Sequence, residues 1–382
     1  MNSRLFSPIK LGQQTLVNRI VVAPMCQYSA IDGAAADWHY QHLSQLGYSG
    51  AGLVMLEATA VERRGRITHQ CLGLYSDECV QTLADVMTRV RRLAGPAKFG
   101  IQLAHAGRKG STHIPWAQKH GPLQPGEDPW QTVAPSAVPF DTHWPAPEPL
   151  SVHQMQAVLE AFATAARHAV DIGFDAVELH GTHGYLLHQF LSPLSNQRTD
   201  DFGGNLENAM RFPLQVAAAV RAAVPPHVIL GMRITGTDWT PGGWTPDDAV
   251  KFTQKLKAMS YDYVCVSSGG LVPHAEIPVG PGYQVHLAHK IKQETGIATR
   301  AVGMIATPHQ AEEIIAAGEA DMVAMARAFL DDPRWGWHAA DALGVSEQVL
   351  AHYPQQYRRA ARHVWAGAAQ QSANRSDRGK RG

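Results

Sequence analysis

Short apolar runs alternate along this chain with longer stretches in which apolar residues recur every three or four positions. Eight of the short runs are continuously apolar, which is typical of parallel strands buried on both faces. We expect strands at Ile20–Met25, Leu53–Ala58, Phe99–His105, Ala176–His180, Val228–Ile234, Tyr263–Ser267, Thr299–Gly303 and Asp321–Ala326. The stretches between them predict amphipathic helices, one of which carries Met155, Val158 and Phe162 on a single face.

Helix boundaries are marked by capping residues. Ser151 with Gln154, and Thr307 with Gln310, have the spacing of a capping box, in which side chains satisfy orphan backbone N–H groups. Gly173 stands where a helix should end. Eight strands alternating with helices predict an α/β fold, a closed (β/α)8 TIM barrel formed by residues 1–366. No G-x-G-x-x-G motif follows the first strand, which argues against an open dinucleotide-binding sheet.

Three segments interrupt this alternation. Residues 4–19 predict a small hairpin that caps the bottom of the barrel. Residues 106–150 and 185–204 are long loops after the third and fourth strands, so we expect them at the carboxyl-terminal mouth, where barrel enzymes keep their chemistry. Residues 367–382 are rich in Ala, Gln, Ser and Arg and are expected to form a disordered tail.

Composition narrows the class of protein. Hydrophobic residues make up 45% of the chain, charged residues 17%, and the formal net charge is zero. No basic field is present to recruit nucleic acid, and no apolar stretch approaches the roughly 18 residues of a membrane span. The four cysteines form no C-x-x-C pair, and the first ten residues carry no secretory signal. We therefore expect a cytoplasmic protein without nucleic-acid or membrane partners.

Polar residues at the carboxyl ends of the predicted strands are site candidates, because a barrel interior is otherwise filled with apolar side chains. His180 and His183 end the fourth strand on a turn with flanking glycines, and Tyr185 follows. The two histidines could donate hydrogen bonds, bind a metal or simply pack, although no Asp, Glu or Cys stands nearby at ligand spacing. Arg233 ends the fifth strand and Arg327 follows the eighth, where barrels often bind phosphate.

Taken alone, these residues predict an anionic, phosphate-bearing ligand at the barrel mouth. The two histidines would polarise a group above it, and Tyr185 would offer a proton. A cofactor-dependent reductase and a metal- or phosphate-dependent barrel isomerase or aldolase both meet this description. The residues by themselves leave the choice open.

Four motifs occur in order along the chain. They are Ala23–Tyr28 (APMCQY), Gly100–Arg108 (GIQLAHAGR), Glu178–Leu186 (ELHGTHGYL) and Phe190–Asp200 (FLSPLSNQRTD). With this combination the chain resembles the old yellow enzyme family, FMN-containing NAD(P)H oxidoreductases, from Leu5 to about Trp365. Because it has a cysteine at position 26, the chain resembles the bacterial thermophilic-like ene-reductase branch of that family.

The resemblance implies where FMN lies. Four residues would line the isoalloxazine ring: Pro24, Met25, Cys26 and Ala58. Gln102 would bind its pyrimidine edge, and Arg233 would lie beside the N1/C2 carbonyl region, where negative charge collects on reduction. The phosphate would be held by Gly303, Met304, Ala326 and Arg327; the family often has glycine where this chain has Ala326.

The resemblance also implies a reaction. NAD(P)H, with NADPH preferred, would give hydride to FMN, and hydride would pass to the β-carbon of an α,β-unsaturated carbonyl compound. His180 and His183 would activate the carbonyl, Tyr185 would give the proton, and Tyr28 would line the substrate pocket. Enones, quinones and nitro compounds are the expected substrates. A non-catalytic flavin-binding protein is a second alternative, beside the isomerase or aldolase.

In this branch an arginine near the carboxyl terminus often reaches into the neighbouring subunit's site. Arg359 is the candidate here, with Arg358 and Arg362 as alternatives, and a plain surface charge run as the other interpretation. The resemblance therefore implies a homodimer or homotetramer.

Overall fold

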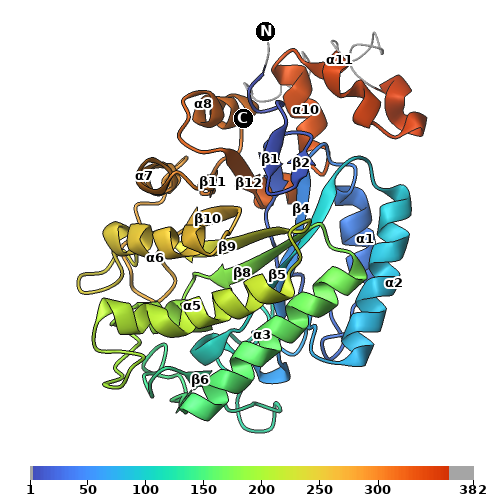
Figure 1. Cartoon of the computed structure of the whole chain (residues 1–382). Helices are drawn as coiled ribbons and strands as arrows, with labels where there is room; N and C mark the ends of the chain where they lie inside the picture. Colours follow the sequence, from blue (N-terminus) through green and yellow to red (C-terminus); the bar gives the residue numbers. More distant parts are fainter. Residues whose placement is uncertain (1–2, 361–382) are drawn as a thin grey trace.

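The computed structural model describes residues 3–360 as a closed barrel of eight parallel strands with helices around it (Figure 1). Around the barrel the order is β3–β4–β5–β8–β9–β10–β11–β12, and β12 pairs with β3 to close it. The strands are β3 (Ile20–Val22), β4 (Leu53–Ala60), β5 (Lys98–Ala104), β8 (Ala176–Gly181), β9 (Ile229–Thr235), β10 (Tyr263–Ser267), β11 (Ala298–Ala301) and β12 (Met322–Met325). All eight predicted strands are confirmed, and so is the barrel. The ends of the predicted barrel domain and the predicted tail, residues 1–2 and 361–382, lie outside the described residues.

Two strands end at least two residues earlier than predicted. β3 ends at Val22 rather than Met25, because Pro24 cannot donate a hydrogen bond to the ladder. β11 ends at Ala301 rather than Gly303, whose φ of 111° belongs to a turn. In both cases the residues that leave the ladder lie at the mouth of the barrel.

The predicted hairpin closes the opposite end of the barrel. β1 (Ile9–Leu11) and β2 (Gln14–Leu16) pair antiparallel, with Ile9 opposite Leu16. Leu11 and Leu16 are buried in one apolar cluster with residues from inside the barrel, among them Leu53 and Tyr263. Burial of this apolar surface fixes the hairpin against the amino ends of the strands.

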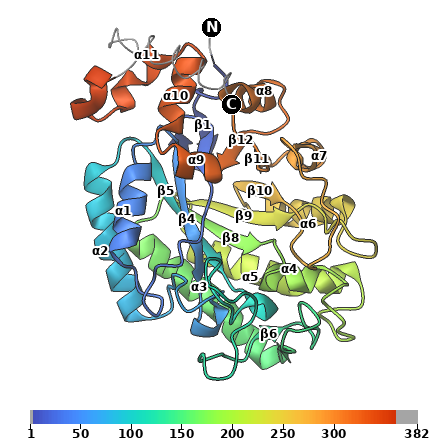
Figure 2. The same cartoon turned by 180° about the vertical axis from the view of Figure 1, so that it is seen from behind.

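Helices cover the outside of the barrel (Figures 1 and 2). Those between strands are α1 (Asp37–Leu46), α2 (Asp77–Leu93), α3 (Val152–Ile172), α5 (Leu206–Ala223), α6 (Pro246–Ala258), α7 (Val285–Thr295) and α8 (Pro308–Ala316). Ser151 and Gln154 form the predicted capping box at the start of α3, and Gly173 ends that helix with a left-handed φ of 88°. Thr307 accepts from the Gln310 N–H, but the Gln310 side chain turns to the Ala306 N–H, so this second box is only half formed.

The two long loops at the mouth are fastened to one another. The loop after β5 contains β6 (Val133–Ala134) and β7 (Glu148–Pro149), and the loop after β8 begins with α4 (Leu186–Leu191). Arg198 of the second loop donates to the carbonyl oxygens of Pro135, at 3.1 Å, and Leu150, at 2.6 Å. This arginine of the FLSPLSNQRTD motif therefore has a structural role.

The carboxyl-terminal segment packs at the closed end. It contains α10 (Trp335–Ala342) and α11 (Ser346–Val349), which lie beside the β1–β2 hairpin in both views (Figures 1 and 2). A Cβ atom on Gly336 would meet the backbone of Gly50, just before β4, at 2.7 Å, so the two backbones touch. Among residues 3–360, no helix has the length and apolar character needed to cross a membrane.

Candidate active site

The turn after β8 brings three predicted residues together. The rings of His180 and His183 have centroids 5.2 Å apart, and those of His180 and Tyr185 are 4.9 Å apart. His180 is 3% exposed, whereas His183 and Tyr185 are half-buried. A strand end followed by a tight turn therefore gathers two imidazoles and a phenol at one place on the mouth.

The backbone of this turn is unusual. His183 has a φ of 58°, in the left-handed region that side chains rarely occupy, and Gly184 follows with a φ of 73°. A Cβ atom on Gly184 would lie 2.3 Å from the carbonyl oxygen of Gly270, so only glycine fits there. Two backbone segments thus touch, and the His183–Gly184 step needs supporting contacts to persist.

Three side chains supply those contacts. Lys109 donates to the carbonyl oxygen of His183 at 3.0 Å, and Gln189 donates to that of Gly184 at 2.7 Å. The Gly184 N–H donates to Nδ1 of His188 at 2.9 Å. The Gly184 N–H and the carbonyl oxygens of His183 and Gly184 are therefore paired.

The two histidines differ in their partners. Within the described part of the chain, neither ring nitrogen of the buried His180 has a hydrogen-bond partner. Nε2 of His183 lies 2.8 Å from the hydroxyl of Ser267 at the end of β10. Desolvation and the nearby charge of Arg233 lower the pKa of both imidazoles well below the usual range, so both are neutral. Unpaired nitrogens on a buried neutral imidazole are suited to a ligand.

Tyr185 is held as a neutral phenol. Desolvation raises its pKa well above the ordinary value, and the acidic groups of Cys26 and Tyr28 add to the shift. The ammonium of Lys109 lies 5.4 Å from the centre of its ring. A phenol that keeps its proton at neutral pH can give it to a substrate, and a nearby cation stabilises the phenolate that results.

A cavity of about 1120 Å³ opens at the mouth beside these residues. It is bordered by His183, Arg233 and Ser267 on one side, and by the predicted phosphate residues Gly303, Met304, Ala326 and Arg327 on the other. Nε of Arg233 is buried without a hydrogen-bond partner among residues 3–360. Two arginines and exposed turn backbone make this cavity suited to an anionic ligand.

Gly303 shapes the far wall of the cavity. A Cβ atom there would lie 2.8 Å from Nε2 of Gln284 and 3.1 Å from the Tyr283 ring. Its φ of 111°, and the φ of 50° at Met304, turn the backbone sharply after β11. A side chain at position 303 would therefore displace Gln284 and Tyr283, which also line the cavity.

The predicted ring-lining residues come from the opposite side of the mouth, after β3 and within β4. Desolvation, with Cys71 and Glu57 nearby, raises the pKa of Cys26, which therefore remains a thiol rather than a reactive thiolate. Ala58 and Tyr185 border a small gap of about 10 Å³, close to the size of one water molecule. Pro24 and Met25 lie on the loop that leaves β3.

Tyr28 continues this loop toward the rim. It has a φ of 48°, and its ring meets that of Trp116, from the insertion after β5, edge to face at 5.5 Å. Trp116 is 65% exposed. These two aromatic rings form part of the wall around the mouth.

Gln102 is fixed from below by buried polar residues that the sequence analysis did not identify. Its Nε2 donates to Oε1 of Glu178 at 2.8 Å, and Oε2 of Glu178 accepts from the Tyr263 hydroxyl at 2.8 Å and from Arg300. Glu178 and Arg300 are 0% exposed. Each charge is compensated by the other, as burial requires.

Arg359 lies far from the histidines of its own chain. It is exposed on the short helix Gln355–Ala360, and the neighbouring Tyr357 packs 6.0 Å from Tyr48, which precedes β4. That is the closed end of the barrel. Arg358 donates to the Ala351 carbonyl oxygen at 3.3 Å, and Arg362 lies outside the described residues.

A metal centre is not apparent at the predicted pair. Across residues 3–360, no group of three or more His, Cys, Asp and Glu side chains is placed so that it could hold a metal ion. His180 and His183 therefore lack a third protein ligand of those types.

Comparison with known proteins agrees with this geometry. The sequence pattern of the NADH:flavin oxidoreductase / NADH oxidase family matches residues 4–344. The chain is 40% identical over 360 residues to an NADPH dehydrogenase of Geobacillus sp. (strain WCH70), covering 94% of this chain and 100% of that protein. It is 41% identical over 362 residues to an NADPH dehydrogenase of Bacillus cytotoxicus, covering 94% and 97%.

Solved structures give the same fold. Morphinone reductase superposes with a TM-score of 0.75 and 26% identity, covering 90% of each chain. A 2-naphthoyl-CoA reductase, at 24% identity and a TM-score of 0.79, covers 90% of this chain and 53% of that one. With the matched pattern spanning most of its length, the chain belongs to the NADH:flavin oxidoreductase / NADH oxidase family, the old yellow enzyme family.

Proposed function

We propose that this chain is an FMN-dependent ene-reductase that reduces carbon–carbon double bonds activated by a carbonyl group. The observation that carries the proposal is the buried, neutral His180 with two unpaired ring nitrogens, placed 4.9 Å from the ring of Tyr185. Hydrogen-bond donors and a proton donor at one spot are what reduction of an enone requires. The similarity to morphinone reductase supports a substrate of this kind.

FMN and NADPH are the cofactors of this family, and the residues present fit FMN. Arg233, with its unpaired Nε, would lie beside the flavin carbonyl region, and Arg327 with the backbone at Gly303 would hold the phosphate. Gln102, anchored by Glu178, would meet the pyrimidine edge, while Cys26 as a thiol would influence the flavin potential. When bound, FMN supplies hydride transfer from NADPH to the substrate β-carbon.

The protein's own residues then act on the substrate. His180 and His183 donate hydrogen bonds to the carbonyl oxygen and stabilise the negative charge that develops on it, each worth about 3–4 kcal/mol in such sites. Tyr185 gives its proton to the α-carbon, and the Lys109 ammonium, 5.4 Å from the ring centre, stabilises the phenolate. Tyr28 and Trp116 border the substrate entrance.

Arg359 acts, in this proposal, only in a homodimer or homotetramer. Because it lies at the closed end of its own barrel, it could contact substrate only in another copy. Enones, quinones and nitro compounds remain the expected substrate classes.

The visible spectrum tests the function directly. Purified protein should show flavin absorption that bleaches on anaerobic addition of NADPH and returns on addition of cyclohexenone. His180→Ala combined with His183→Ala should keep FMN and lower cyclohexenone turnover by at least about 100-fold. A colourless protein that takes up no FMN would exclude the proposal. Bound FMN without NADPH oxidation would favour the non-catalytic alternative.

A further inference from the structure

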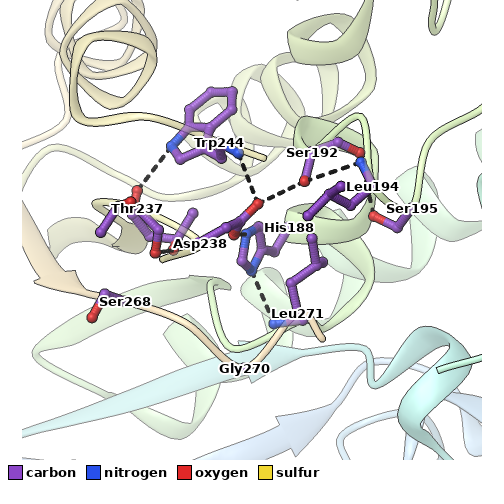
Figure 3. Close-up of polar contacts among 12 residues, drawn as sticks. His188, Ser192, Leu194, Ser195, Thr237, Asp238, Trp244, Ser268, Gly270 and Leu271 are labelled. Carbon is purple, nitrogen blue, oxygen red and sulfur yellow. Dashed lines mark hydrogen bonds and ion pairs between the residues drawn. The ribbon is translucent and has the colours of Figure 1, made fainter. Parts of the chain in front are cut away.

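The turn that carries His183 and Tyr185 is tied to a buried pair outside the predicted site. Nδ1 of His188, in α4, accepts the Gly184 N–H at 2.9 Å, and Nε2 of the same ring lies 2.8 Å from Oδ1 of Asp238. Both side chains are 0% exposed. Figure 3 shows Asp238 between His188 and Ser192, with Trp244 close by.

Asp238 is itself firmly held. Its Oδ2 accepts the Ser192 hydroxyl at 2.6 Å and the Trp244 N–H at 2.8 Å, and its own N–H donates to the Trp244 carbonyl oxygen at 3.0 Å. Burial alone would raise the pKa of Asp238, but His188 and these hydrogen bonds outweigh it and lower the pKa, so the carboxylate is ionised. A buried carboxylate whose oxygens all have hydrogen-bond partners is held in a fixed position, so it can in turn fix the His188 ring.

The hydrogen bonds fix which nitrogen of His188 carries the proton. The backbone N–H of Gly184 can only donate, so Nδ1 of His188 must accept and must be unprotonated. The proton is then on Nε2, where it is donated to Asp238. Asp238 thereby selects the one imidazole tautomer that can bind the turn.

We propose that His188 and Asp238 are positioning residues for catalysis: by holding the Gly184 N–H, they keep the left-handed His183–Gly184 step that aims His183 and Tyr185 at the substrate. The inference rests on the proposed function for the roles of His183 and Tyr185. It gives a role to His188, which lies between two of the motifs, and to the motif residue Ser192, which holds Asp238; the substrate chemistry uses neither.

Matched substitutions separate the two hydrogen bonds. In His188→Asn, the amide oxygen can replace Nδ1 as acceptor for Gly184, while the contact with Asp238 is lost. In His188→Gln, the longer amide can reach Asp238, while the Gly184 N–H is left without its acceptor. Asp238→Asn presents an amide N–H to Nε2, which moves the imidazole proton to Nδ1, where it opposes the Gly184 N–H.

We expect His188→Gln and Asp238→Asn to keep FMN and to lower kcat for cyclohexenone about 10- to 100-fold, since a displacement of about 1 Å can cost that much. His188→Asn should lose markedly less. Asp262→Asn is the control, because Asp262 accepts the Leu230 N–H at the closed end of the barrel. Its effect on kcat should be small.

A second readout does not depend on FMN or activity. Nitrogen-15 NMR of labelled histidines should find the wild-type His188 proton on Nε2 and the Asp238→Asn proton on Nδ1. Hydrogen exchange at the Gly184 amide should be faster in His188→Gln than in His188→Asn. These measurements on the folded apoprotein decide the geometry even where a variant loads FMN poorly.

A wild-type proton on Nδ1 would overturn the proposal, and so would His188→Gln and Asp238→Asn variants that are folded, FMN-loaded and as active as wild type. Variants that fail to fold leave the decision to the wild-type tautomer and to exchange at Gly184 in His188→Asn. Wild-type protein without FMN or NADPH oxidation would instead refute the proposed function, with the tautomer result unaffected.

Discussion

His183 and Ser267 face one another across the mouth of the barrel, with Nε2 and the hydroxyl oxygen 2.8 Å apart. Ser267 is the last residue of β10, whereas His183 lies on the turn after β8, so the contact joins a strand end and a turn that are 84 residues apart in sequence. The single proton of the Ser267 hydroxyl can go to Nε2 of His183 or to Oε1 of Gln284, which lies farther away at 3.3 Å. When it goes to Nε2, the His183 proton is on Nδ1 and is available to a substrate carbonyl.

Ser267→Ala should therefore remove the hydrogen bond that orients the His183 imidazole toward the substrate. We expect kcat/KM for cyclohexenone to fall about 3- to 10-fold, the effect of losing one ordinary hydrogen bond of about 1 kcal/mol. Ser268→Ala is the control, since the Ser268 hydroxyl donates to Gln284 at 2.6 Å instead of contacting His183. Equal losses in the two variants would contradict the assigned contact.

Lys109 should give the reaction an alkaline limit. Desolvation and the neighbouring Arg108 charge lower its pKa from 10.5 to about 8, so the cation beside Tyr185 is present below pH 8 and disappears above it. Stopped-flow oxidation of the reduced enzyme by cyclohexenone should slow as pH rises through about 8. Lys109→Met should be slower than wild type below about pH 8 and should lack this limb, so that the two rates converge at higher pH. Lys119→Met, at an exposed lysine of the insertion, should behave like wild type.

The same shift has a consequence for stability. Because the folded-state pKa of Lys109 lies below the unfolded value, the unfolded chain binds more protons between about pH 8 and pH 10.5. The contribution of this residue to the free energy of unfolding therefore rises with pH across that window. Denaturant unfolding of wild type and Lys109→Met at pH 7 and pH 10 measures it, and a gap that stays constant would contradict the shift.

Arg233 should set the ease of flavin reduction. Arg233→Met removes a positive charge from the flavin carbonyl region, so the midpoint potential should become more negative by about 30 mV for each tenfold loss in preference for the two-electron reduced form. Arg327→Met should release FMN more readily with little change in potential, because it would contact only the phosphate. Spectroelectrochemical titration and FMN content measure both effects. A potential that moves equally in the two variants would refute the assignment.

The buried pair of Glu178 and Arg300 should matter chiefly for stability. Arg300→Met leaves the Glu178 carboxylate buried without its cation, which typically costs about 3–5 kcal/mol in the free energy of unfolding. Adding Glu178→Leu should recover part of that loss: it removes the uncompensated charge, but leaves the Gln102 amide and the Tyr263 hydroxyl without their acceptor. The exposed Lys290–Glu294 pair offers a control, and Lys290→Met should leave the denaturation midpoint in place.

The barrel could be predicted because its strands are continuous apolar runs between helices with clear periodicity. Strand ends were less predictable: Pro24 and Gly303 end the ladders early because of their own backbone constraints. The short α4 and α9 (Arg327–Asp331) were absent from the prediction, since helices of five or six residues carry too little periodicity to detect.

Site residues could be predicted where a polar side chain stands at the carboxyl end of a predicted strand, as for His180 and Arg233. Lys109 was missed because its partners, the carbonyl oxygens of His183 and Gly270, are 74 and 161 residues away in the chain. Asp238 was missed for the same reason. Glu178 and Arg300 did leave a signal, since each is a charged residue inside a predicted buried strand, where a partner of opposite charge is expected.

The contact between Gly184 and Gly270 limits how this enzyme could diverge. A side chain at either glycine would strike backbone of the other segment, at 2.3 Å in one case and 3.0 Å in the other, so no change at one position can be compensated at the other. Glycine is therefore required at both positions for as long as the two loops keep this contact. New substrate preferences are more readily gained by substitutions in the insertion that contains the exposed Trp116. Its sequence can change without disturbing the catalytic residues on the turn after β8.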